Sequence, residues 1–375
     1  MYYRSPFAIA LTVVILVVLV VGLAAWQFVS IKSTGTPLGD AMRTPEHIVQ
    51  IISTQERYLP SLHRNPAKDR FRLDLLIVSI ADPTRQEMVT LIRQQQANAL
   101  QPMTKILGAD GDIVWVQALD LFAVNLKNKR VLRLRDIEKA NPELNHFLAS
   151  ATFDFEEQLI AVSPDRQQAY AVSGDTLKVT STTAPRRTDW VSPSAGAEVM
   201  LCSGGMITPD EWLGALVAKE LAGSFKPGLS LPRDFPVNTA KESRQIYRAR
   251  IATNDIRPRI ETMERLSETE YRNAAFIRSG RDATILRPPQ PDSVLLTWRT
   301  SHLKDGTTQV ARLDPAGTII WTTDTGIDYL KQILPGVELT AFIGERPPGP
   351  NKVPEPMLVL VNTATGATNV VSLWR

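Results

Sequence analysis

Short apolar runs of four to eight residues, each closed by turn residues, fill the chain from about His47 almost to its last residue. Runs of this length that alternate with polar positions are typical of β-strands. The 26 prolines are spread through the same region and argue against long helices, because an interior proline removes a backbone hydrogen bond. The pattern predicts an all-β domain over residues 47–375.

A different pattern precedes this domain. The stretch Phe7–Val29 consists almost entirely of Ala, Ile, Leu, Val and Phe, and no charged residue occurs from Ser5 to Ile31. As a helix, its 23 residues would extend roughly 34 Å, enough to cross the ~30 Å hydrocarbon layer of a bilayer. We therefore expect residues 1–31 to form a short tail and a transmembrane signal anchor. Cleavage after the small residues Gly22–Ala25 and a buried core helix are the alternatives.

The charges on the two sides of this span are nearly balanced, with Arg4 and the α-amino group before it and Lys32 and Arg43 after it. A short tail before a long hydrophobic run is the usual arrangement of a signal anchor. We therefore expect a cytoplasmic N-terminus and a periplasmic or extracellular soluble domain. Residues 32–46 hold two Gly, two Pro and several Ser and Thr without apolar periodicity, which predicts a linker.

One sequence motif, called the repeated phrase below, recurs in the strand region. It consists of an alternating apolar strand, then Asp or Asn, a turn, and a second apolar strand. It occurs at Leu76–Val89, Leu121–Leu132, Val310–Trp321 and Leu358–Val371, with a looser copy at Leu159–Val172. Each copy predicts a β-hairpin. The turn residues expected to accept backbone hydrogen bonds are Asp82, Asn125, Asp314 and Asn362, and those expected at positive φ are Gly317 and Gly366.

The spacing of these copies predicts the architecture. Asp82 and Asn125 are 43 residues apart, Asp314 and Asn362 are 48 apart, and Asp165 follows Asn125 by 40. Four-stranded propeller blades repeat at about 40–50 residues, and the interval between Asp165 and Asp314 leaves room for two more. We expect an all-β fold, a β-propeller of about seven four-stranded blades (six to eight), preceded by one N-terminal transmembrane helix. Closure is expected to pair a strand near residues 47–54 with the C-terminal strands.

The phrase at Val310–Trp321 resembles the repeats of quinoprotein-like (PQQ-type repeat) β-propellers, and Leu121–Leu132 resembles them more loosely. The resemblance implies a propeller in which Trp321 helps to dock one blade on the next. Some members of that family oxidise alcohols or sugars with pyrroloquinoline quinone and calcium, and carry a vicinal cysteine pair that a chain with Cys202 alone cannot supply. Other members are non-catalytic scaffolds of the bacterial envelope, which is the closer analogy.

Charge and motifs add little chemistry. Without Arg4, the soluble part has 41 basic and 39 acidic side chains, a net charge of +2, so we expect no nucleic-acid partner. The basic run Lys127–Arg135 alternates with apolar residues and predicts a strand with one solvated face. Thr208, followed by Pro209 and acidic residues, predicts the start of a short helical insertion near residues 209–222.

No catalytic, cofactor-binding or metal-binding residue is predicted, and no cofactor. The features considered were the four histidines (His47, His63, His146 and His302), the pair Glu156 and Glu157, the turn Asp110–Asp112, and Ser203–Gly205. The histidines lack ligand spacing, adjacent glutamates point to opposite faces of a strand, two carboxylates are too few for calcium, and the Ser-Gly-Gly segment is interpreted as a turn.

The sequence therefore predicts a membrane-anchored, extracytoplasmic β-propeller that acts as a non-catalytic scaffold for an unknown protein partner, held in the membrane by residues 7–29. The alternatives are a propeller enzyme, either a hydrolase or a quinone-type oxidoreductase, with a site in the central channel, and a sensor of a small ligand. An enzyme or sensor should gather polar groups around the axis, whereas a scaffold should expose an apolar patch.

Overall fold

The structure is a computed structural model, and the residues it describes form ten segments. These are residues 32–57, 70–94, 104–184, 200–217, 242–252, 259–279, 285–288, 293–301, 306–346 and 353–373. In these segments no helix is both long and apolar enough to cross a bilayer. The predicted span at residues 7–29 lies outside them.

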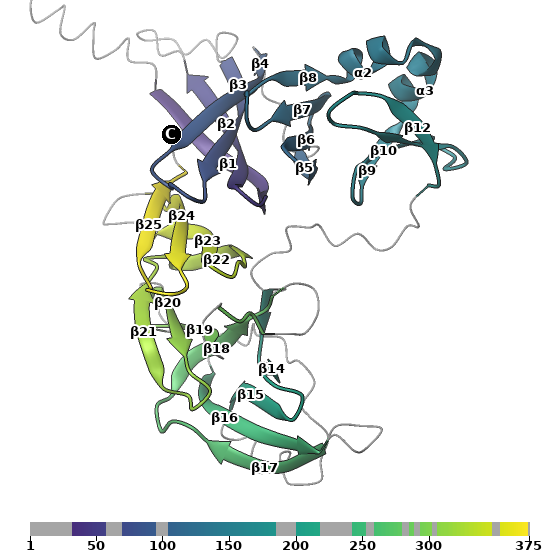
Figure 1. The fold of residues 1–375 in the computed structure, drawn as a ribbon. Helices are drawn as coiled ribbons and strands as arrows, with labels where there is room; N and C mark the ends of the chain where they lie inside the picture. Colours follow the sequence, from purple (N-terminus) through teal and green to yellow (C-terminus); the bar gives the residue numbers. More distant parts are fainter. Residues whose placement is uncertain are drawn as a thin grey trace, which may run out of the picture.

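The described residues form six successive sets of four antiparallel strands, called sheets 1 to 6 in chain order (Figure 1). Sheet 1 contains β1 (Lys32–Arg43), β2 (His47–Arg57), β3 (Arg70–Ser79) and β4 (Gln86–Gln94). Sheet 2 contains β5 (Lys105–Asp110), β6 (Ile113–Gln117), β7 (Leu121–Asn125) and β8 (Val131–Arg133). Sheet 3 contains β9 (Thr152–Phe155), β10 (Leu159–Val162), β11 (Ala169–Val172) and β12 (Val179–Thr182).

The second half repeats the arrangement. Sheet 4 contains β14 (Gly204–Met206), β15 (Glu211–Leu216), β16 (Ser243–Ala252) and β17 (Arg259–Arg265). Sheet 5 contains β18 (Tyr271–Ile277), β19 (Val294–Arg299), β20 (Thr308–Leu313) and β21 (Ile319–Asp324). Sheet 6 contains β22 (Tyr329–Leu334), β23 (Leu339–Arg346), β24 (Glu355–Asn362) and β25 (Thr368–Ser372). The short strand β13 (Leu201–Cys202) pairs with β18, and β16 also pairs with β18, so sheets 4 and 5 are joined.

Four-stranded antiparallel meanders of this kind are the blades of β-propellers. The six sheets lie within the predicted range of six to eight and one below the central expectation of seven. Buried apolar clusters join sheet 3 to 2, 2 to 1, 1 to 6, 6 to 5 and 5 to 4. The sheets therefore follow one another along an arc, and sheets 3 and 4 lie apart at its two ends (Figure 1).

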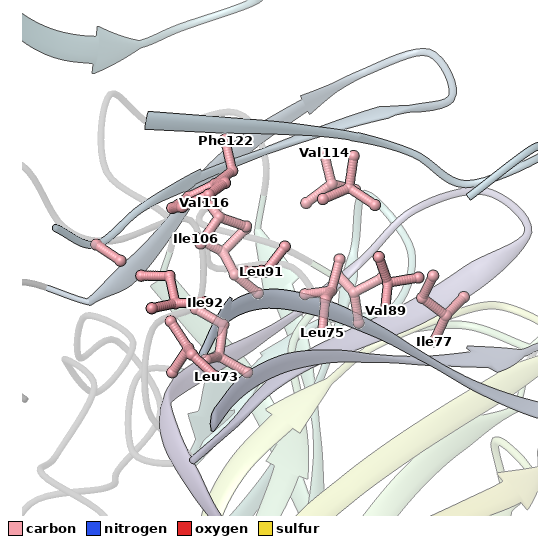
Figure 2. Close-up of a cluster of buried hydrophobic side chains, with 14 of the residues drawn as sticks. Leu73, Leu75, Ile77, Val89, Leu91, Ile92, Ile106, Val114, Val116 and Phe122 are labelled. Atoms are coloured by element: carbon pink, nitrogen blue, oxygen red, sulfur yellow. The ribbon is translucent and has the colours of Figure 1, made fainter. Parts of the chain in front are cut away.

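The core between sheets 1 and 2 shows how neighbouring sheets pack. Figure 2 shows Leu73, Leu75 and Ile77 of β3 on one side and Val114 and Val116 of β6 on the other. These side chains alternate along their strands with residues that face the opposite side of the sheet, because successive side chains of a strand point to opposite faces. Each sheet inside the arc can therefore bury both faces.

Sheet 1 meets sheet 6 through backbone as well as through apolar side chains. The register between β1 and β2 shifts between Leu38 and Met42, so Ala41 has no partner residue on β2. The side chain of Gln332 fills this position: its Oε1 accepts a hydrogen bond from the Ala41 N–H at 2.9 Å, and its Nε2 donates to the Ala41 carbonyl at 2.8 Å. Gln332 and Ala41 are both buried, so one amide links the first sheet to the last.

The repeated phrase forms the predicted hairpins. Four copies span the third and fourth strands of sheets 1, 2, 5 and 6, but the looser copy at 159–172 spans the second and third strands of sheet 3. The turn acids and amides accept backbone hydrogen bonds as expected. The donors are Thr84 N to Asp82, Lys127 N and Asn128 N to Asn125, Thr318 N to Asp314, and Ala364 N and Thr365 N to Asn362. Gly317 and Gly366 have φ of +79° and +74°.

The predicted linker at 32–46 is wrong, because residues 32–43 form β1. The register shift after Leu38 interrupts the alternation of apolar residues, so the strand pattern is hidden in the sequence. The expected closure is wrong as well. Strand β2 pairs with its sequence neighbours β1 and β3, and the C-terminal strands form a sheet of their own.

The helix expected near residues 209–222 is a strand where the structure describes it. Residues Trp212–Leu216 of β15 are all buried, and a continuously apolar run of this length suits a two-sided strand as well as a helix. Thr208 donates a hydrogen bond to the Asp210 side chain. Ser203–Gly205 also differs from the turn that was expected, since β14 starts at Gly204.

Helices occur instead between β8 and β9, as α2 (Leu134–Ala140), the 3-10 turn η3 (Pro142–Leu144) and α3 (Asn145–Ser150). Of the basic strand predicted over Lys127–Arg135, only Val131–Arg133 forms a strand, and residues 127–130 form the turn before it. The Arg133 N–H donates to the Asp136 side chain. Hydrogen bonds from the Asn141 side chain join this insertion to the edge of sheet 3. Its Nδ2 donates to the Leu177 carbonyl, and its Oδ1 accepts a hydrogen bond from the Val179 N–H.

Candidate functional site

A small cleft lies between the β14–β15 turn of sheet 4 and the β20–β21 turn of sheet 5. It holds about 310 Å³ of space, open solvent at its mouth included. Its lining residues are Ile207, Thr208, Glu211, Arg287, Val294 and Pro315. Ile207 and Val294 are buried, whereas Arg287 is exposed and donates a 3.4 Å hydrogen bond to the Met206 carbonyl. Because the volume of about 310 Å³ includes open solvent, the cleft itself is smaller than the ~300–1,000 Å³ that is usual for ligand sites.

The side chains considered in the sequence do not converge on this cleft. His47 lies on β2 and His146 on α3, while His63 and His302 lie outside the described residues. Among the described residues, no three His, Cys, Asp or Glu side chains gather closely enough to hold a metal ion.

The acidic candidates also lie away from the cleft. Asp110 ends β5, and Gly111, at φ +55°, forms the turn that follows it. Asp112 pairs with Lys127 at 2.6 Å, so its carboxylate already has a cationic neighbour. Glu156 and Glu157 are exposed in the turn after β9. Cys202 is buried, and its thiol lies 3.6 Å from the Phe276 carbonyl.

Charged groups meet across sheets 1 and 2 at one end of their contact. Lys129 forms a 3.1 Å ion pair with Glu87, and hydrogen bonding to Lys129 holds the pKa of Glu87 below its usual value. Burial, reinforced by the charge of Lys129, lowers the pKa of His47. This group stabilises the contact between the two sheets.

Exposed apolar side chains gather in one part of the fold. Of the large apolar residues that are exposed in the described segments, all but one belong to sheets 5 and 6 or the segments joined to them. They are Ile319, Ile320, Tyr329, Val337, Val353 and Val370, and we call this set the apolar rim; the exception is Leu119. The strands β21 and β25 are the outer strands of these two sheets (Figure 1).

Trp321 joins the outer parts of sheets 5 and 6. Its Nε1 donates a 3.2 Å hydrogen bond to the Thr363 carbonyl, and its ring lies so close to Gly366 that a Cβ there would be 2.8 Å from ring atoms. The expected docking role of Trp321 between neighbouring sheets is confirmed. The apolar rim was not identified from the sequence, because four of its residues occupy strand positions that do not differ in pattern from buried ones. The other two, Val337 and Val353, lie between strands.

No protein-family model matches the chain, and no curated protein matches it. Similar solved structures include the β-propeller domain of the trilobed protease from Pyrococcus furiosus, described as having an open velcro topology. That domain is 10% identical, with a TM-score of 0.25, over 92% of this chain and 94% of the other.

The Pyrococcus horikoshii acylaminoacyl peptidase is 10% identical over 90% of this chain, with a TM-score of 0.26. An acylaminoacyl peptidase in complex with Z-Gly-Gly-Phe-chloromethyl ketone is 12% identical over 93%, also at 0.26. The chain spans 52% of each peptidase. At these TM-scores the fold rests on the sheet topology of this chain, and the resemblance to quinoprotein-like repeats stays a prediction.

Proposed function

We propose that this protein is a membrane-anchored, non-catalytic scaffold that binds a protein partner through the apolar rim. The observation that carries the proposal is the concentration of exposed apolar side chains on sheets 5 and 6. Scattered exposed apolar residues are normal on a soluble surface, but a local concentration marks an interaction site. Val353 and Tyr329 are 66% and 62% exposed, so their burial by a partner would remove apolar area from water.

The anchor and the location of the domain belong to the same proposal. Residues 7–29 hold the chain in the membrane, with the N-terminus in the cytoplasm and the sheets in the periplasm or outside the cell. Protease added to intact spheroplasts should then degrade a C-terminal epitope tag on the full chain. Protection of the tag, with cleavage only after lysis, would contradict this orientation.

In-cell crosslinking of the full chain, followed by mass spectrometry of the captured proteins, tests the scaffold function. The test variant combines Ile320→Ser, Val353→Ser and Val370→Ser, which removes exposed apolar groups and leaves the buried clusters intact. The matched control is Leu119→Ser, since Leu119 is exposed on sheet 2, away from the rim. A defined partner that is captured by the wild type and the control, but not by the triple variant, supports the proposal.

The opposite result is equally informative. Equal capture of every partner by all three proteins would contradict binding at the rim. The cleft between sheets 4 and 5 would then be the next surface to examine, with small ligands as probes.

A further inference from the structure

The outer edge of β25 presents backbone groups in a known order. Asn362 N–H donates to the Ala367 carbonyl, and Leu373 N–H donates to the Pro356 carbonyl, both at 2.9 Å. Hydrogen-bonded and non-hydrogen-bonded pairs alternate along an antiparallel ladder. The regular register between these two bonds therefore directs the N–H and C=O groups of three residues away from β24. These residues are Thr368, Val370 and Ser372.

Other outer strands carry features that oppose further strand pairing. Natural proteins protect edges with charges, bulges or very short strands. Strand β4 carries Glu87 and Arg93, β17 carries charged residues and pairs through a register shift, and β8 is three residues long. Strand β21 has a bulge at Ile320, and the Val179 N–H of β12 is bonded to Asn141.

Strand β25 has none of these features. Its five residues, Thr368–Ser372, include no charge and no proline, and their register with β24 is unbroken. Val370 is 51% exposed, whereas Val371, on the opposite face, is buried between sheets 6 and 1. The cross-strand neighbour of Val370 is Val359, which is buried in the cluster that contains Trp321. An added strand would thus meet a regular backbone edge and one exposed apolar side chain.

We propose that an extended segment of a partner protein adds to β25 as a fifth strand of sheet 6. Its backbone bonds to Thr368 and Val370, and a β-branched or aromatic side chain packs beside Val370. The segment is uncharged where it faces β25, because the edge offers no opposite charge to a buried ion. Strand addition of this kind obtains affinity from main-chain hydrogen bonds and specificity from alternate side chains.

The small area of the edge favours a peptide segment over a second copy of this chain. Stable interfaces bury about 1,200–2,000 Å² in total. An edge of five residues with one large exposed side chain is too short to supply that area between two rigid copies. A flexible segment can bind at such an edge and continue over the neighbouring apolar rim. The inference rests on the proposed function and specifies how the partner is held.

The probe is the peptide acetyl-Thr-Val-Thr-Val-Thr-Val-amide, added to the full chain labelled with ¹⁵N-valine. Amide hydrogen exchange at Val370 should slow by about tenfold or more at saturation, because its outward N–H becomes hydrogen-bonded. The test variant is Val370→Pro, which removes this donor at an edge position where proline is tolerated. The matched control Val370→Thr keeps the donor and should bind the peptide, measured by fluorescence anisotropy, within about threefold of the wild type.

Three results would overturn the inference. One is unchanged exchange at Val370 with up to about 1 mM peptide, a concentration that corresponds to binding of roughly 4 kcal/mol. Another is protection that increases with protein concentration without peptide, which would assign the edge to a second copy. The third is that the triple rim variant fails to capture the partner in cells while Val370→Pro still captures it. That result would support the scaffold function but exclude strand addition. The wild-type exchange measurement decides the question even if Val370→Pro fails to fold.

Discussion

Replacement of Gln332 by leucine should weaken the contact between the first and last sheets. The substitution places an apolar side chain of similar size in this buried position and removes both hydrogen bonds to Ala41. The Ala41 N–H and C=O would then be buried without their partner. Each such group costs about 1–3 kcal/mol, so we expect the free energy of unfolding to fall by about 2–6 kcal/mol. That is a large part of the ~5–15 kcal/mol of an ordinary domain.

Urea unfolding of the full chain, followed by tryptophan fluorescence, measures this loss. The matched control is Gln158→Leu, in the exposed turn before β10, which should change the free energy by less than about 0.5 kcal/mol. A second variant, Gln332→Glu, should be more stable near pH 4 than near pH 7, because only the protonated acid can both donate to the Ala41 carbonyl and accept from its N–H. A loss under about 0.5 kcal/mol for Gln332→Leu would refute the reasoning.

Three further predictions concern contacts between sheets. Gly108→Ala should destabilise the contact of sheets 2 and 3, because the new Cβ would lie 2.1 Å from the Phe155 ring. Adding Phe155→Leu to this variant should recover part of the lost thermal stability, and no recovery would contradict the clash. Trp321→Phe should cost about 1 kcal/mol in urea unfolding through loss of the bond to Thr363, and an unchanged midpoint would count against it. Because burial lowers the pKa of His47 in the folded state, its contribution to stability should rise with pH between that lowered pKa and about 6.5, and His47→Gln should remove this step from the pH profile of unfolding.

Local chemistry explains what could be predicted from the sequence. The turns after Asp82, Asn125, Asp314 and Asn362 were predictable because each depends on hydrogen bonds within a few residues of the side chain. The same hairpins, at their spacing, indicated four-stranded sheets. Trp321 was placed correctly because its copy of the phrase is the most regular one.

The elements that were missed depend on partners distant in sequence or on irregular pairing. Strand β1 has a bulge that Gln332, 291 residues away, completes, so residues 32–46 by themselves resemble a linker. Strand β15 is buried on both faces between elements that the sequence does not bring together, and its apolar run is compatible with a helix.

The sequence by itself determined the all-β class, the hairpins and the charge balance, because strand alternation and turn hydrogen bonds are local properties. Only the tertiary structure decided that the sheets follow an arc, that Gln332 joins the first sheet to the last, and that Val370 is exposed while Val371 is buried. Val370 and Val371 are the same residue type, so composition does not distinguish them. Packing of one sheet against the next determines which of them meets water.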